Sequence, residues 1–302
     1  MEFGIVATNQ GWLDGHWELL DGTRFTALYV VDHPSFPIPD PWTYLAFVAA
    51  RTRRIRLGTH VTGAAFHHPT ELAKQIATVD VLSGGRATLG IGTAYEHQDF
   101  APYGFPMPSA RVRREILEET IILLKSLWTR ESTAFDGLHF CYEGGAAFAP
   151  KPVQHPHPPI IVGVNTPGAL LRLAVRHATG INTWQLGPAQ VAALRAALAG
   201  ECESSGRAPD SVRLTADVLL ARGADEAGAR TLAAEIAAMA RSWGRSAAAT
   251  RWDAAGVLFG DAAAMREQVR QFAAVGVSEL SVAINGVDDL VWFSDNVIAG
   301  AP

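Results

Sequence analysis

The stretch IRLGTHVTGAAFHHPTELAKQIATVDVLSGGRATLGIG, residues 55–92, contains a complete strand–helix–strand unit. Its two ends, 55–62 and 87–92, are largely apolar, as buried strands of a parallel sheet are. Between them, residues 69–82 repeat apolar side chains near the 3.6-residue period, which predicts an amphipathic helix. The helix is expected to end at Ser83-Gly84-Gly85, because glycine favours the backbone conformation that terminates helices. The unit therefore predicts parallel strands covered by helices.

The same alternation of apolar runs and amphipathic stretches continues along the chain. It predicts eight strands, at 3–7, 26–31, 55–62, 87–92, 159–164, 181–184, 213–221 and 279–284. Further helices are expected at 110–128, from a cap at Thr166 and Pro167 to His177, and from a cap at Asp261 to Val275. Eight strands separated by helices predict an α/β protein, a single (β/α)8 TIM barrel domain spanning residues 1–302.

An open doubly wound sheet is the main alternative, but the first strand is followed by Thr8-Asn9-Gln10-Gly11 and not by a glycine-rich phosphate turn. Two long segments, 95–108 and 130–158, are expected to be insertions at the C-terminal mouth of the barrel. Loops of this kind build the active sites of barrel enzymes.

Composition and charge exclude several classes of function. The net charge of −5 and the absence of a basic run argue against nucleic-acid binding. Cys141 and Cys202 lie outside any metal-ligand spacing, so no metal site and a reducing compartment are expected. No signal peptide is evident, and no apolar run approaches the roughly 20 residues that span a bilayer. We therefore expect a cytoplasmic protein that does not enter a membrane.

Two places in the sequence combine acid–base groups with the expected barrel mouth. Asp32 and His33 follow the second predicted strand, where a histidine beside a carboxylate could exchange protons; the alternative is that both residues cap a loop. Glu96 follows the fourth strand, and it is either a second catalytic carboxylate or a solvated loop residue.

Other strand ends suggest contacts with a ligand. Thr62 and Gly63 would let a flat ring approach the backbone, although on these residues alone a tight turn around Gly63 is the better explanation. Thr93 offers a hydroxyl group after the fourth strand. The turn Gly163-Val164-Asn165-Thr166 meets a helix N-terminus, which suits a phosphate. Six aromatic residues are near the expected mouth and could line an apolar pocket or belong to the core: Trp12, Trp17, Tyr95, Phe100, Tyr103 and Trp184.

Several short motifs then occur together: TRRIRLGT at 52–59, ATVDVLSGGR at 77–86, LGIG at 89–92, YGFP at 103–106 and GVLFGD at 256–261. Together they resemble the luciferase-like monooxygenase superfamily, over nearly the whole chain. Asp32-His33 is similar to the Asp-His pair of the branch that depends on the deazaflavin coenzyme F420.

The resemblance implies a barrel that binds coenzyme F420, or alternatively FMN, at its C-terminal mouth. It implies that Asp32 contacts the deazaflavin ring and that His33 acts as acid or base. Thr62-Gly63 matches a strained bulge, often a cis peptide, behind the ring. Thr93 and the turn 163–166 match the regions that hold the tail and phosphate. Glu96 stands later than the family's glutamate, and the turn 163–166 lacks a second glycine.

The expected activity is hydride transfer between reduced F420 and a small organic substrate. One alternative is an FMN-dependent monooxygenase that uses dioxygen and is supplied by a separate reductase. Another is a flavin- or deazaflavin-binding protein without catalysis. Similar proteins are commonly homodimers, so a homodimer is expected.

Overall fold

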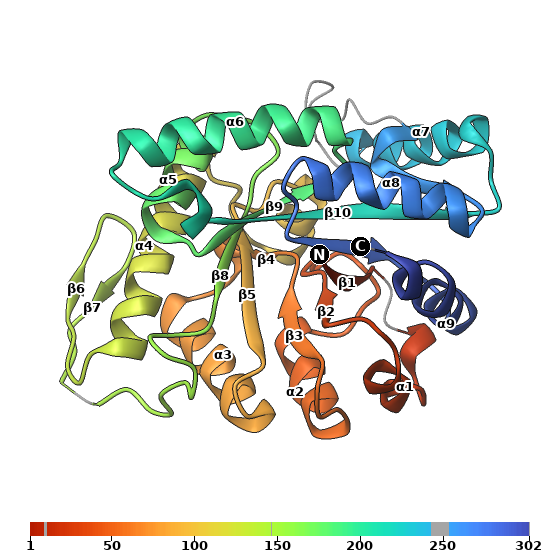
Figure 1. Cartoon of the computed structure of the whole chain (residues 1–302). Coiled ribbons are helices and arrows are strands. Elements are labelled where there is room, and N and C mark those ends of the chain that lie inside the picture. The colour runs from red at the N-terminus through yellow and green to blue at the C-terminus, as the bar shows by residue number, and fades with distance from the viewer. Residues whose placement is uncertain (9–10, 146, 243–253, 302) are drawn as a thin grey trace.

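A parallel β-barrel forms the centre of the protein (Figure 1), in a computed structural model that describes residues 1–8, 11–145, 147–242 and 254–301. Its strands are β1 (Glu2–Ala7), β2 (Ala27–Val30), β3 (Arg56–Thr59), β5 (Ala87–Gly92), β8 (Ile160–Gly163), β9 (Gly180–Trp184), β10 (Arg213–Arg222) and β12 (Glu279–Ala283). They are hydrogen-bonded in the order β10-β12-β1-β2-β3-β5-β8-β9, and the pairing of β9 with β10 closes the barrel. The predicted TIM barrel is confirmed, with all eight strands close to their expected positions.

Helices surround the barrel and cover its apolar outer face. They are α1 (Trp17–Gly22), α2 (Pro41–Arg51), α3 (Pro69–Ser83), α4 (Ala110–Thr129), α5 (Ala169–His177), α6 (Pro188–Ser204), α7 (Glu226–Ser242), α8 (Ala262–Ala274) and α9 (Val287–Asn296). The strand β4 (Thr62–Gly63) extends β3 beyond a bulge, and β11 (Val257–Gly260) pairs with the end of β10. No helix in the described part of the chain is long and apolar enough to cross a membrane.

Local signals place most helix ends correctly. Gly84 follows α3 with a φ of 70°, as expected of a terminating glycine. The side chain of Asp261 accepts a hydrogen bond from the Ala264 amide and caps α8. The expected cap at Thr166 is wrong, because α5 begins at Ala169 after Gly168. Gly168 adopts a φ of 136°, a backbone conformation that glycine reaches much more easily than other residues. The turn before α5 is therefore longer than expected.

The segment 130–158 lies on the outside of the helical layer and not over the strand ends, so its expected position at the mouth is wrong. It forms a hairpin of β6 (Phe135–Asp136) and β7 (Cys141–Tyr142) beside α4 (Figure 1). The Glu119 carboxylate on α4 accepts hydrogen bonds from three consecutive amides of the hairpin turn, at 138–140. The chain then returns to the amino-terminal end of β5, where Gln154 bonds the Ala87 carbonyl. Of the two predicted insertions, only 95–108 lies at the mouth.

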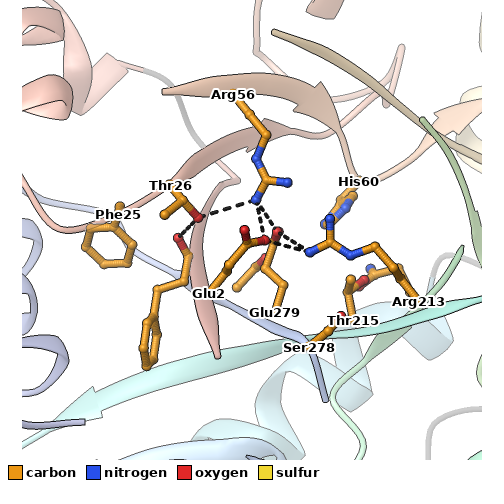
Figure 2. A network of polar contacts seen from close by, with 12 residues as sticks. Glu2, Phe25, Thr26, Arg56, His60, Arg213, Thr215, Ser278 and Glu279 are labelled. Carbon is orange, nitrogen blue, oxygen red and sulfur yellow. Dashed lines mark hydrogen bonds and ion pairs between the residues drawn. The ribbon is translucent and has the colours of Figure 1, made fainter. Parts of the chain in front are cut away.

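Charged residues fill the amino-terminal end of the barrel. Figure 2 shows Arg56 in contact with the neighbouring carboxylates of Glu2 and Glu279. One guanidinium nitrogen lies 2.8 Å from Glu2 and 2.6 Å from Glu279. Arg213 reaches the same two carboxylates. Tyr29 is buried against Glu279, and burial together with that negative charge raises the pKa of its phenol well above its usual value. These paired charges close the end of the barrel that lies opposite the mouth.

A histidine crosses the barrel above this layer. His60 follows β3 and stacks on the Tyr29 ring with 3.6 Å between ring centroids. Its Nδ1 lies 3.1 Å from both carboxylate oxygens of Asp217, on β10. The strand order places β3 and β10 on opposite sides of the barrel. The His60–Asp217 pair therefore spans the interior, and Asn182 donates a further hydrogen bond to Asp217 at 2.8 Å.

Candidate active site

Asp32 is buried just beyond the carboxyl end of β2, at the mouth. Its Oδ2 accepts a hydrogen bond from the Gly63 amide at 3.0 Å and lies 2.7 Å from His67 Nε2. Burial alone would lower the pKa of His67, but the hydrogen bond and charge of Asp32 outweigh it and raise that pKa. Both contacts of Asp32 within the described residues use Oδ2, so Oδ1 can serve a ligand.

His33 pairs with a carboxylate that the sequence analysis did not single out. Its Nδ1 lies 2.8 Å from Oδ2 of Asp99, which is 1% exposed. The other oxygen of Asp99 accepts hydrogen bonds from the amide and the hydroxyl group of Ser35. Burial would raise the pKa of Asp99, but the hydrogen bonds from His33 and Ser35 hold it below its usual value. Asp99 thus fixes the orientation of a histidine that is itself 22% exposed.

Glu96 lies in the same loop as Asp99, but its carboxylate is not displayed at the open face. It precedes the short helical turn His97–Asp99 and is 2% exposed. The loop 95–108 therefore carries two buried acidic residues, Glu96 and Asp99, and Asp99 is the one that contacts His33.

The bulge between β3 and β4 occurs where the resemblance implied one, with the cis peptide at His60–Val61 and not at Thr62–Gly63. The Val61 side chain faces two glycines: a Cβ on Gly92 would approach it to 2.8 Å, and one on Gly163 to 3.5 Å. The hydroxyl group of Thr62 is buried, donates to Thr59 and accepts from Trp42, so a ligand could contact only its backbone. A Cβ on Gly63 would lie 2.5 Å from the Phe66 ring.

Backbone conformations near the mouth also depart from regular strands. Ala94, after β5, has a φ of 52°, and Gln185, after β9, has a φ of 57°. Non-glycine residues adopt this left-handed conformation at an energetic cost and concentrate at functional sites. The two positions lie at strand ends on the side of the barrel that carries Asp32 and His33.

A cavity of about 240 Å³ lies between the end of β5, α4 and the start of α5. It is lined by two threonines and two arginines, with apolar residues beside them: Thr93, Arg113, Arg114, Thr166, Ala110, Pro167, Ala169 and Leu170. Arg113 Nε is buried without a hydrogen-bond partner among the described residues. Burial and repulsion by Arg114 lower the pKa of Arg113. Two adjacent cations beside a helix N-terminus make this cavity suitable for an anion.

Thr93 and Thr166 line the same cavity, whereas the middle of the turn 163–166 has another role. Val164 is buried, and the Asn165 side chain exchanges two hydrogen bonds of 2.9 Å with the backbone of Trp184. Asn165 thus joins the ends of β8 and β9 and does not point its amide at the cavity. No cluster of three or more His, Cys, Asp or Glu residues that could hold a metal occurs in the described residues.

The aromatic residues divide between the mouth and the outer layer. Trp184, at the end of β9, packs against two apolar clusters. Within the loop 95–108, Phe100 is buried and contacts Phe66, whereas Tyr103 is exposed. Trp17 instead contacts Tyr44 and Phe47 on α2. The Trp12 side chain and residues 9–10 lie outside the described part of the structure.

This arrangement defines a (β/α)8-barrel protein whose mouth carries a histidine paired with a buried carboxylate and a cavity lined by two arginines. The family model of the luciferase-like monooxygenases matches residues 18–285, and the chain belongs to that family.

Individual relatives agree with this assignment. An uncharacterized protein of Mycobacterium tuberculosis is 42% identical over 124 residues, which are 41% of this chain and 42% of that protein. An F420-dependent glucose-6-phosphate dehydrogenase of Kineococcus radiotolerans is 32% identical over 175 residues, or 55% and 47% of the two chains. The matched regions thus span less than half of these relatives.

Solved structures share the fold over its full length. An F420-dependent secondary alcohol dehydrogenase, in complex with an F420-acetone adduct, has a TM-score of 0.83 at 16% identity and covers 100% of this chain and 99% of its own. The monooxygenase RslO1 from Streptomyces bottropensis has a TM-score of 0.78 at 25% identity and covers 99% of both chains.

Proposed function

We propose that the chain is an oxidoreductase that uses coenzyme F420 to transfer hydride to or from a small organic substrate. The observation that carries the proposal is the His33–Asp99 pair at the mouth, 2.8 Å apart, beside Asp32. Hydride transfer to a carbonyl, or from an alcohol, requires a matching proton transfer, and an oriented histidine suits that task.

The residues at the mouth fit a ring cofactor with an anionic tail. Arg113 and Arg114, with the hydroxyl groups of Thr93 and Thr166, would hold a phosphate in the cavity beside α5. The buried Nε of Arg113, which has no partner among the described residues, would then gain an acceptor. Asp32 would accept a hydrogen bond from the ring edge through Oδ1, and the backbone at 61–63 would support the ring.

When bound, the deazaflavin supplies the carbon that gives or takes the hydride. The chain supplies the proton and the geometry. Asp99 accepts the Nδ1 proton of His33, which leaves Nε2 as the nitrogen that exchanges a proton with the substrate oxygen. Asp32 keeps its position because the Gly63 amide and His67 hold its Oδ2. Glu96, buried in the loop 95–108, remains a candidate for a second acid.

An FMN-dependent monooxygenase is the second candidate, and the similarity to the monooxygenase RslO1 favours it. Its reduced flavin would come from a separate reductase. A homodimer and a cytoplasmic location remain predictions for either enzyme.

Oxygen dependence separates the two enzymes. Turnover of a panel of alcohols and carbonyl compounds would be measured with F420 and with reduced FMN, each with and without dioxygen. Turnover with F420 that persists without oxygen supports the proposal. Activity only with reduced FMN and oxygen contradicts it and supports the second candidate.

A further inference from the structure

Trp184 contacts two buried apolar clusters. It ends β9, and its side chain packs against the cluster Val6, Ala27, Tyr29 and Val31, which includes strand β2. The same side chain packs against a second cluster that includes Leu219 of β10 and Ala283 of β12. In the strand order, β9 and β2 lie halfway around the barrel from each other. The indole is therefore in contact with a cluster formed by β1 and by β2, the strand that precedes His33.

The loop after β2 continues this apolar surface. The Phe36 ring stacks on the His33 imidazole with 4.4 Å between centroids, and Phe36 and Ile38 pack against the same cluster as Trp184. The clusters themselves are buried, whereas Trp184, Phe36 and His33 are only partly buried. A molecule that reaches His33 at the mouth thus meets aromatic side chains.

In the described part of the chain, the cations that line the cavity at the mouth come from α4. Arg113 and Arg114 line the cavity between β5 and α5, and the proposed function assigns this cavity to the anionic part of the cofactor. His67, the basic group next to Asp32, is already paired with that carboxylate. Among the described residues, the cavity between β5 and α5 is cationic, whereas His33 stacks on Phe36 beside the apolar cluster that Trp184 also contacts.

We infer that the substrate is an uncharged, predominantly apolar alcohol or carbonyl compound and that Trp184 determines this specificity. The inference rests on the proposed function, because His33 defines where the reacting oxygen binds. A sugar phosphate would bury a dianion against Trp184 and Phe36, and burying a charge without a partner is strongly unfavourable. A cyclic or branched aliphatic group would instead bury apolar area against both rings.

The test compares cyclohexanol and cyclohexanone with glucose and glucose 6-phosphate, with Trp184→Ala and Trp184→Phe as variants. Trp292→Phe is the matched control, since Trp292 lies on α9 with Arg222 over its ring and packs against the main core, not against the two clusters that Trp184 contacts. The dissociation constant of the cofactor is measured first for each protein. The substrate kinetics are then measured with F420 or FMN, whichever binds. If neither cofactor binds, the binding of the four compounds to the free protein is measured by calorimetry.

We expect the wild-type protein to prefer the cyclohexyl compounds over both sugars by at least about 100-fold in kcat/KM or in binding constant. Trp184→Ala should lower the kcat/KM or the binding constant of the cyclohexyl compounds by about tenfold or more, and Trp184→Phe should have an intermediate effect. Cofactor affinity in both variants, and all values in Trp292→Phe, should stay within about twofold. A preference for glucose 6-phosphate, or an unchanged KM in Trp184→Ala, overturns the inference. Failure of the proposed function would appear separately, as absent F420 binding.

Discussion

His33 and Asp99 are 66 residues apart in the chain, and their side chains meet at 2.8 Å. The two loops that carry them follow β2 and β5, so the barrel itself brings the pair together. Ser35 fixes the other oxygen of Asp99 through two hydrogen bonds. A partly exposed histidine backed by a buried, hydrogen-bonded carboxylate has a fixed tautomer and orientation, which is what a proton-exchanging group needs.

The first prediction concerns this pair. His33→Ala should reduce kcat by about 10²–10⁴-fold, because it removes the proton-exchanging group. Asp99→Asn should reduce kcat by about tenfold or more, because an amide no longer fixes the same tautomer. In both variants the dissociation constant of the cofactor should stay within about twofold. Steady-state kinetics and a fluorescence titration measure the two quantities, and wild-type kcat in His33→Ala would rule out the acid–base assignment.

A second prediction concerns the cavity beside α5. Arg113→Ala and Arg114→Ala should each weaken cofactor binding by about tenfold, because each removes a charged partner of the phosphate. Arg111→Ala is the control: it lies on the same helix, its side chain is 78% exposed, and it pairs with Glu115. Its cofactor affinity should remain that of the wild type. Equal affinities in all three variants would mean that the anionic group binds elsewhere.

The third prediction concerns the close contact of β5 with the last residue of β3. A Cβ on Gly90 would lie 1.8 Å from the Thr59 carbonyl oxygen, a backbone atom that cannot move freely. Gly90→Ala should therefore lower the free energy of unfolding by about 3 kcal/mol or more. Gly200→Ala, on α6 with open space around it, should instead raise it by about 0.5–1 kcal/mol. Urea denaturation of both variants checks this contrast, which a wild-type stability of Gly90→Ala would contradict.

The fourth prediction is a pH dependence of stability from His67. Asp32 raises the pKa of His67 in the folded protein above its usual value of 6.5, despite the opposing effect of burial. The contribution of this pair is fully present below about pH 6.5 and is lost as the pH rises through the raised pKa. Denaturation at about pH 6 and about pH 8.5 should show a larger loss in the wild-type protein than in His67→Gln. The same loss in both proteins would show that His67 does not carry the effect.

Much of the fold could be predicted because the signals are local. The helix Pro69–Ser83 shows its period and its terminal glycine within a few residues of sequence, and the strands beside it are short apolar runs. The start of α5 was misplaced because Thr166 and Pro167 carry the usual signals of a helix start, while the conformation of Gly168 depends on the turn. The position of 130–158 was wrong because only the contacts with Glu119 reveal where the hairpin packs.

The candidate site was only partly predictable for the same reason. Asp32 and His33 stand together at a strand end, so they could be found in the sequence. Asp99 could not, since its role depends on a contact between distant loops. Arg113 and Arg114 resemble ordinary surface residues of an amphipathic helix until α5 is placed beside them. Thr62 looked like a ligand contact, yet its hydroxyl group bonds within the core.

The most direct test of the account is a fluorescence titration of the purified protein with coenzyme F420 and, separately, with FMN. We expect F420 to bind with a dissociation constant in the micromolar range or below, and more tightly than FMN by at least about tenfold. Arg113→Ala, measured alongside, should lose part of that affinity. Tighter binding of FMN, or no binding of F420, would contradict the assignment of a deazaflavin-dependent hydride transfer.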